Sequence, residues 1–457
     1  MTALKTLLLS TYEMGRQPFG LASPAAWLRA EGAEVTCLDL SLQPLDEEAV
    51  RAADLIAFYL PMHTATRIAG SALKRVRRLN PRAYLCAYGL YAPLNAAWLR
   101  ELGVATVLGG EFESGLAQLV RELASQNPPP LQKDLVSPER QQFRVPDRRG
   151  LPELGKYARL VLPDGTRKVV GYTEASRGCK HLCRHCPVVP VYQGQFRIVQ
   201  RDVVLEDIRQ QVTAGAQHIT FGDPDFFNGI GHALEIVREL HREHPALTYD
   251  VTIKVEHLLK HAQHLPTLRD TGCAFVTSAV ESVDDRVLAL LDKGHTRADF
   301  VRLAGLFEDV GLALAPTFVA FTPWITMEGY EDLLQTVCDL GLVNNVAPVQ
   351  WSIRLLIPSG SRLLELPEIG RIVGEFHQAA LSYRWRHPDP RVDALQREIE
   401  AMVRESGEDG CDRRSIFEHA WRLLRRALGT EPSAALPAVA PGRTRATIPY
   451  LTEPWYC

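Results

Sequence analysis

Short apolar runs alternate with longer stretches of helical periodicity through the first 125 residues of the chain. After each run, apolar residues recur every three or four positions, as on one face of a helix. Ser23 and Pro24 stand where a helix N-cap and a first-turn proline belong, and Gly32 where that helix should end. The pattern predicts a parallel sheet covered by helices. The predicted strands are residues 4–9, 35–40, 55–60, 84–88 and 104–108.

Residues 1–125 are therefore predicted to form a Rossmann-like or flavodoxin-like domain. Ligands of such sheets bind at the carboxyl ends of the strands. Those ends lead here into residues 10–20, 61–66, 89–95 and 109–113.

Residues 126–165 break the periodicity and predict a Pro-rich linker, because Pro128, Pro129 and Pro130 follow one another and more prolines come after them. A second alternating series occupies residues 166–365 and predicts a complete or partial β/α barrel. Its predicted strands are residues 218–221, 249–254, 274–280, 313–319 and 348–355.

The pattern becomes mostly helical and rich in charge over residues 366–430. An amphipathic segment at residues 414–428 is predicted to cap the barrel. Residues 431–457 begin with an Ala/Pro-rich run and are predicted to form a flexible tail. The expected fold class is α/β with a helical C-terminal extension.

Composition agrees with a globular protein of two or three domains, since 46% of the 457 residues are apolar and 23% are charged. The formal net charge of -3 argues against a large sequence-independent nucleic-acid footprint. The N-terminus lacks secretory features, and no apolar run reaches the roughly 18 residues of a membrane span. We expect a cytoplasmic protein with neither a membrane nor a nucleic acid as its partner.

Three of the nine cysteines, Cys179, Cys183 and Cys186, form a C-x3-C-x2-C loop, which indicates metal ligation in a reducing compartment. Three thiolates can hold a 4Fe–4S cluster and leave its fourth iron open. That iron can be chelated by a methionine moiety, so that an electron enters the sulfonium. A structural zinc site with His181 or His185 as a further ligand is the alternative.

The segment EASRGCKHLCRHCP, residues 174–187, resembles the signature loop of the radical S-adenosylmethionine (SAM) superfamily, whose three cysteines hold the cluster. His185 stands where that family often has an aromatic residue that contacts adenine. Three more segments resemble the family's in the expected order: ITFGDPDFFN (219–228), TSAVESVDDRVLALLDKGHT (277–296) and SIRLLIPSGS (352–361). The resemblance implies SAM contacts from Gly222, Asp223, Asp225, Glu281, Ser282 and Arg354.

Four of these residues also have a structural interpretation. Asp223 and Asp225 flank Pro224 as turn formers do. Glu281 is compatible with a solvated strand end, and Arg354 with a structural role.

The sheet domain in front of the barrel resembles the cobalamin-binding arrangement of class B radical SAM proteins, and GGEFES (109–114) resembles the turn before that domain's last helix. A glycine turn at a helix start can approach a macrocycle or a phosphate closely. The resemblance implies cobalamin as a candidate cofactor, with contacts from Gly109, Gly110 and Glu111. No D-x-H-x-x-G stretch supplies a lower axial ligand, so His63 in LPMHTATR is the candidate.

The segment STYEMGRQPFGLASPAAWL (10–28) and the final EPWYC resemble a radical SAM group named for a Cys-Cys/selenocysteine-Ala-Glu-Pro tail. One hypothesis is that a selenocysteine codon after Cys457 was read as a stop; a natural terminus is the alternative. With the tail, Cys457 would be a redox residue on a flexible arm.

We expect an enzyme that reductively cleaves SAM at a 4Fe–4S cluster to start radical chemistry on a small molecule that the sequence does not identify. Cobalamin-dependent methylation is the finer hypothesis, and flavodoxin or ferredoxin the expected electron donor. The alternative is a non-catalytic zinc or iron–sulfur protein with a redox or structural role.

Overall fold

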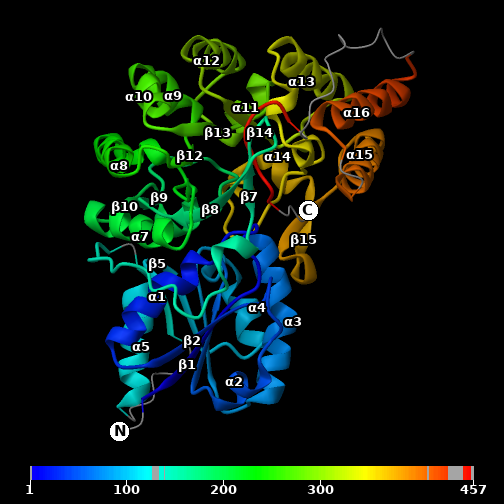
Figure 1. Cartoon of the computed structure of the whole chain (residues 1–457). Coiled ribbons are helices and arrows are strands. Elements are labelled where there is room, and N and C mark those ends of the chain that lie inside the picture. The colour runs from blue at the N-terminus through cyan, green and yellow to red at the C-terminus, as the bar shows by residue number, and fades with distance from the viewer. Residues whose placement is uncertain (1–2, 126–132, 138, 409–410, 431–445, 454–457) are drawn as a thin grey trace.

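The computed structural model describes residues 3–125, 133–137, 139–408, 411–430 and 446–453. A parallel-sheet domain lies below a larger curled sheet, and two long helices lie at the side of the larger domain (Figure 1). Within the described ranges, no helix is both long enough and apolar enough to cross a membrane.

The N-terminal sheet has six parallel strands in the order β2-β1-β3-β4-β5-β6. This order is flavodoxin-like, with an added strand. The first five strands were predicted, whereas β6 lies in the segment that the prolines had marked as linker. The strands are β1 (Lys5–Ser10), β2 (Glu34–Asp39), β3 (Leu55–Tyr59), β4 (Tyr84–Tyr88), β5 (Thr106–Gly110) and β6 (Lys133–Ser137).

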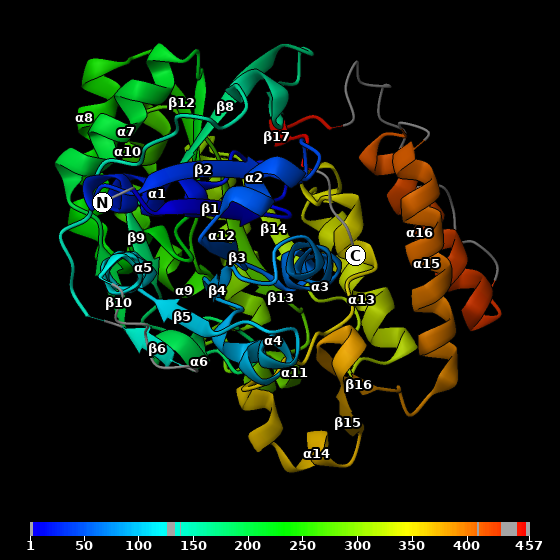
Figure 2. The ribbon, with the colours of Figure 1, turned by 90° about the horizontal axis from the view of Figure 1, so that it is seen from below.

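Two apolar layers sandwich this sheet. Helices α1 (Phe19–Ala30) and α5 (Phe112–Ala124) bury Leu21, Leu28 and Leu116 on one face. Helices α2 (Glu47–Ala52), α3 (His63–Leu79) and α4 (Ala96–Glu101) cover the other face. Seen from below, helices flank the sheet on both sides (Figure 2). The carboxyl ends of its strands are left facing the second domain.

The second sheet has the order β14-β13-β12-β11-β8-β7-β17 and curls into a half barrel. Its five parallel strands are β8 (Arg167–Thr173), β11 (His218–Phe221), β12 (Thr248–Thr252), β13 (Cys273–Glu281) and β14 (Leu314–Phe318). The strands β7 (Arg159–Val161) and β17 (Tyr450–Leu451) extend one edge in antiparallel pairing. The outer helices are α7 (Arg201–Thr213), α8 (Ile230–Glu243), α9 (Val255–Lys260), α10 (Leu265–Asp270), α11 (Asp285–Leu291), α12 (Arg297–Val310) and α13 (Met327–Asp339).

The predicted strand at residues 348–355 is wrong. The segment Pro348–Trp351 is a 3-10 helix, and a single bridge joins Arg354 to Phe321. Pro348 has no N–H to donate to a sheet ladder, which favours this turn over a strand. The barrel therefore stays open on this side.

The C-terminal extension contains a hairpin as well as helices. It consists of α14 (Pro367–Gly370), the hairpin β15 (Val373–His377) and β16 (Ser382–Trp385), α15 (Pro390–Glu408) and α16 (Arg413–Leu428). Helix α16 matches the predicted amphipathic segment, and its Phe417 packs edge-on against the buried Trp351 at 5.3 Å. Part of the predicted tail is described and forms β17, whereas Cys457 lies outside the described residues.

Candidate active site

The cysteine loop begins where β8 ends, at the carboxyl edge of the barrel. Strand β9 (Ser176–Gly178) leads into the loop, and α6 (Val189–Tyr192) and β10 (Phe196–Ile198) follow it. Strand β10 pairs back on β9, so the loop is closed at its base. Gly178 has φ +73°, and a Cβ there would lie 2.4 Å from the Tyr192 ring. Only glycine satisfies both constraints.

The three loop cysteines are reduced thiols, with Cys183 buried and the other two half-buried. Burial raises the pKa of Cys179, and it raises the pKa of Cys186 to about 12. The buried ammonium of Lys293 attracts negative charge on Cys183 and Cys186. Burial therefore favours the neutral thiols of Cys179 and Cys186 until a metal displaces their protons.

The spacing of the sulfur atoms separates a cluster from a mononuclear zinc site. Two thiolates on one zinc lie within about 4.6 Å of each other, since each Zn–S bond is about 2.3 Å. Among the described residues, the ligand atoms found within 4.8 Å of one another belong to Cys179, His181 and Asp225, and the three cysteine sulfurs form no such group. In this arrangement the three sulfurs therefore do not all meet around one zinc, and a zinc on the first group would leave Cys183 and Cys186 unused.

Glu281 connects β13 to the cysteine loop. Its carboxylate lies 3.1 Å from Nε2 of His185 and 3.3 Å from Nζ of Lys293. Burial opposes its ionisation, but Lys293 and His185 outweigh burial and lower the pKa of Glu281 to about 2. Glu281 also has φ +69° at an irregularity in strand pairing. A non-glycine residue in this region costs roughly 1–3 kcal/mol, and such strain gathers at functional sites.

Asp223 and Asp225, which follow β11, bind the cysteine loop and the residues that lead into it. Asp223 accepts hydrogen bonds from the backbone N–H of Ala175 (2.9 Å) and from Oγ of Ser176 (2.6 Å). Its pKa is raised to about 7 by burial. Oδ2 of Asp225 lies 2.7 Å from Nδ1 of His257 and 3.4 Å from Nε2 of His181. Both carboxylates are therefore more than turn formers, and their SAM contacts stay predictions.

The other predicted SAM residues differ in their surroundings. Gly222 fits tightly, because a Cβ there would lie 1.7 Å from the hydroxyl of Tyr172. Ser282 is buried beside Glu281 and accepts the N–H of Asp284 at 3.1 Å. The guanidinium of Arg354 donates to Asp393 at 2.6 Å and lies over the ring of Trp385. Arg354 thus joins the barrel to the C-terminal extension, which agrees with the structural role considered for it above.

The residues predicted to contact cobalamin already have partners within the chain. Nε2 of His63 lies 2.6 Å from the carbonyl oxygen of Ala380, in the turn between β15 and β16. A Cβ on Gly109 would lie 2.2 Å from Pro93, and one on Gly110, where φ is +69°, would lie 2.4 Å from the carbonyl of Ser137. Close chain packing therefore accounts for both glycines.

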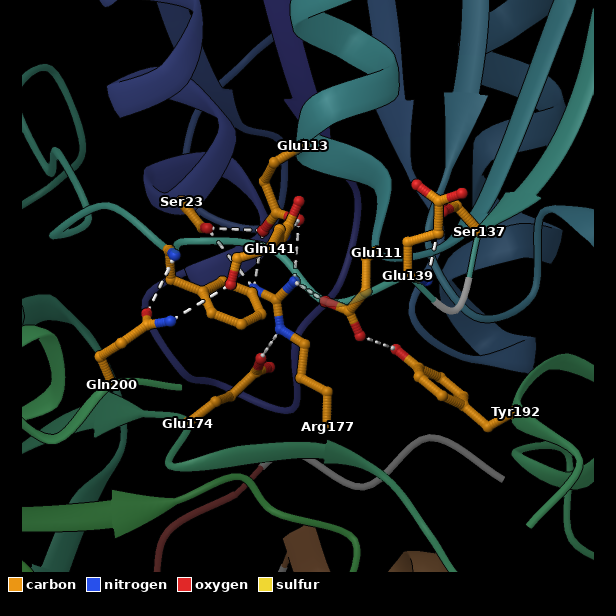
Figure 3. Close-up of polar contacts among 11 residues, drawn as sticks. Ser23, Glu111, Glu113, Ser137, Glu139, Gln141, Glu174, Arg177, Tyr192 and Gln200 are labelled. Carbon is orange, nitrogen blue, oxygen red and sulfur yellow. Dashed lines mark hydrogen bonds and ion pairs between the residues drawn. The ribbon is translucent and has the colours of Figure 1, made fainter. Parts of the chain in front are cut away.

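Glu111 belongs to a buried ion cluster that joins the two domains (Figure 3), and the sequence pattern did not predict this cluster. Arg177, on β9, contacts Glu174 at 2.6 Å, Glu113 at 2.7 Å and Glu111 at 3.3 Å. Glu111 also accepts the hydroxyl of Tyr192. Its pKa is raised to about 7, since burial outweighs the attraction of Arg177. One guanidinium therefore serves three carboxylates.

Two cavities lie near the predicted site residues, and the first of them borders this cluster. One of about 200 Å³ is lined by both domains and reaches Gly178 and Gly222. Another of about 330 Å³ lies inside the half barrel, between its strands and residues 448–453. A third cavity, of about 880 Å³, lies between α1, residues 144–154 and the end of α7, and the cysteine loop contributes nothing to its lining.

Residues 173–337 match the family model of the radical SAM superfamily. This match confirms the superfamily for the domain that carries the cysteine loop. Enzymes of this superfamily use a 4Fe–4S cluster and SAM.

Among solved structures, the fold resembles the radical SAM methyltransferase TsrM from Kitasatospora setae, with 15% identity, a TM-score of 0.68 and coverage of 97% of this chain and 94% of that one. It also resembles the cobalamin-dependent SAM radical enzyme OxsB, with 12% identity, a TM-score of 0.70 and coverage of 88% and 67%. These likenesses establish the two-domain fold.

Curated relatives match a smaller part of the chain than these structures, at higher identity. The ribosomal protein uS12 methylthiotransferase RimO of Bacteroides thetaiotaomicron is 24% identical over 38% of this chain and 41% of that protein. The threonylcarbamoyladenosine tRNA methylthiotransferase MtaB of Aquifex aeolicus is 22% identical over 51% and 55%. The chain spans about half the length of these relatives.

Proposed function

We propose that this protein is an enzyme that reductively cleaves SAM at a 4Fe–4S cluster on Cys179, Cys183 and Cys186 and directs the radical to a small molecule. The observation that carries the proposal is the loop of three reduced thiols. It lies at the carboxyl edge of a half barrel, and its three sulfurs do not all lie within 4.8 Å of one another. When bound, the cluster supplies the electron that breaks a carbon–sulfur bond of SAM.

The residues around the loop hold it in place. Asp223 and Asp225 fix its two sides to β11, and the ion pair of Glu281 with Lys293 fixes His185. Lys293 also places a positive charge near two thiols, which favours their ionised, metal-binding form. Gly222, Asp223, Glu281 and Ser282 surround the loop and are the SAM contacts that we propose. Asp225 and Arg354 act as positioning residues.

Metal analysis combined with spin resonance tests this proposal against the zinc alternative. After anaerobic reconstitution, we expect about four irons per chain and a reduced-cluster spectrum that changes when SAM is added, since three ligands leave one iron open. One zinc per chain, or a reduced-cluster spectrum that does not change when SAM is added, would contradict the proposal.

Cobalamin-dependent methylation is a second candidate, favoured by the fold likeness to TsrM and OxsB along most of the chain. The cavity between the sheet edge and the cysteine loop is about 200 Å³, whereas drug-sized ligands occupy roughly 300–1,000 Å³ and cobalamin is larger. Leu90 and Leu94 pack directly on Val188, Val191 and Tyr192. In this arrangement cobalamin does not fit, and its binding would require the domains to separate.

Absorbance spectroscopy decides whether this second candidate holds. The reconstituted protein is mixed with hydroxocobalamin and passed through a desalting column. Retention of one corrin per chain supports cobalamin-dependent methylation, and complete loss of the corrin leaves SAM cleavage as the function.

The proposed substrate is a small molecule because the cavity beside the loop is small. The named relatives act on tRNA or a ribosomal protein, and the chain's charge of -3 gives no support for such a partner. A cytoplasmic location and a flavodoxin or ferredoxin as electron donor complete the proposal.

A further inference from the structure

The cavity of about 200 Å³ lies where the edge of the N-terminal sheet meets the cysteine loop, and we call it the interdomain chamber. Its walls are unusually rich in ionisable and aromatic groups for so small a space. They come from the loops after β1, β3, β4 and β11, from the ends of β5 and β8, and from β9 and α6, which flank the cysteine loop. The residues used below are Glu13, Arg16, Tyr59, Tyr172, Glu174 and Arg177.

Glu13 is a carboxylate in this wall without a counterion. Its exposed fraction is 7%. No hydrogen bond or ion pair connects its side chain to another residue in the described part of the chain, although its carbonyl accepts the N–H of Arg16. A buried, unpaired carboxylate is costly, and proteins otherwise pair such groups. Burial raises the pKa of Glu13 to about 8, against the weaker attraction of Arg16.

Both cations of the chamber are already paired. Arg16 donates two hydrogen bonds to Glu453, just after β17. Arg177 is shared among Glu111, Glu113 and Glu174. Carboxylates thus outnumber guanidinium groups around the chamber, and among the described residues that line it no cation is left over for an anionic ligand.

The aromatic walls of the chamber suit a cationic ligand. Tyr59 and Tyr172 line the chamber, and Phe112 and Tyr192 complete its aromatic surface. Aromatic faces attract ammonium and guanidinium groups, most strongly where water is excluded. A carboxylate at the end of an aromatic wall is a combination that recognises a cationic group.

We propose that the interdomain chamber binds the protonated amine of a small ligand, with Glu13 as its counterion. The inference rests on the proposed function in one respect, since it makes a small amine the substrate class of that enzyme. The amine can donate to the Glu13 carboxylate while its carbon skeleton lies against the tyrosine rings. Glu13 would then bind the substrate and fix its orientation toward the cysteine loop.

The pH dependence of binding follows from the groups that face Glu13. Arg16 attracts its negative charge, Asp39 and Glu174 repel it, and Tyr59 and Tyr172 lie along the same wall. An ammonium ligand favours ionised Glu13, so the amine binds more tightly as pH rises through the Glu13 pKa.

Binding of matched probes to the full chain, without iron or SAM, tests this inference independently of SAM cleavage. The probes are n-butylammonium, 1-butanol and butyrate, each followed by ligand-observed NMR at pH 9. We expect n-butylammonium to bind and the other two not to. We expect its affinity to fall at least fivefold in Glu13→Gln and to be unchanged in Glu48→Gln, a control at an exposed position on α2.

Equal binding of n-butylammonium and 1-butanol, a preference for butyrate, or unchanged affinity in Glu13→Gln would overturn the inference. If Glu13→Gln does not fold, the wild-type protein decides. Its affinity for n-butylammonium should rise at least fivefold from pH 7 to pH 9, and a flat profile would overturn the inference. SAM cleavage by the same preparation is measured separately, so failure of the proposed function is distinguishable.

Discussion

Arg177 shows how much of the domain junction depends on one residue. Its guanidinium is buried among carboxylates from both domains and lies over the rings of Phe112 and Phe143. Replacing one partner of a buried ion pair leaves the other charge unpaired, at a cost of about 3–5 kcal/mol.

Arg177→Met should therefore lower the free energy of unfolding by about 3–5 kcal/mol, measured by urea titration. Arg201→Met is the control, because Arg201 pairs with Glu235 at an exposed site. A loss in Arg177→Met no greater than in the control would contradict this view of the junction.

Glu111 should make stability depend on pH. Its pKa is about 7 in the folded protein and about 4.5 ordinarily, so the folded state holds the proton more tightly. Its contribution is full below the ordinary pKa and is lost as pH rises through 7. Glu111→Gln should thus gain about 2 kcal/mol over the wild type between pH 5 and pH 8. Urea titrations at both values check this, and parallel behaviour of the two proteins would refute it.

Each of the three loop cysteines should be needed for full iron binding. Cys179→Ala, Cys183→Ala and Cys186→Ala should each bind less than half the iron of the wild type, since two thiolates hold a cubane poorly. Cys338→Ala on α13 is the matched control and should keep full iron. Full iron in any loop variant would count against that cysteine as a ligand.

At the scale of single residues, a shared role could be predicted only for residues that lie close together in the sequence. The three cysteines lie within eight residues, so their shared role could be predicted. Glu111 and Glu113 reach Arg177 across 66 and 64 residues, and no sequence periodicity records such a contact. Glu13 was missed for the same reason, because its isolation depends on which cations are already paired.

Among the elements, β17 connects the end of the chain to the active site. It pairs with β7, and Glu453 follows it and binds Arg16 of the N-terminal domain. Tyr450 also lies under the guanidinium of Arg413 on α16. The segment thus closes the open side of the half barrel.

Removing the Glu453 charge should loosen this closure. Glu453→Gln should lower the free energy of unfolding by roughly 1–3 kcal/mol, because a mostly buried Arg16 loses its charged acceptor. Glu405→Gln, at an exposed position of α15, is the control for a lost surface charge. Identical urea midpoints for the two variants would contradict the role given to β17.

The elements that the sequence missed share a physical cause. The buried strands β1, β3, β4 and β5 appear as apolar runs and were predicted, together with the edge strand β2. Strands β6 and β17 lie at sheet edges, and β7 lies between β17 and β8. Their formation depends on the partner strand, which the local pattern does not contain.

For the whole molecule, the carboxyl edges of two sheets meet around one small chamber. The fold class could be predicted from alternating strands and helices and from the resemblance of the cysteine loop. The way in which the two domains meet could not be predicted, because residues 126–165 carry no pattern that orients the second domain. The structure adds an ion cluster and an uncompensated carboxylate at the place where the chemistry is proposed to occur.

Cleavage of SAM tests the central claim most directly. The reconstituted protein, dithionite and SAM are incubated without oxygen, and 5'-deoxyadenosine and methionine are quantified by mass spectrometry. We predict that both form with the wild type, that neither forms without reductant, and that Cys183→Ala produces neither. A protein that binds four irons and returns SAM intact under reduction would contradict the account.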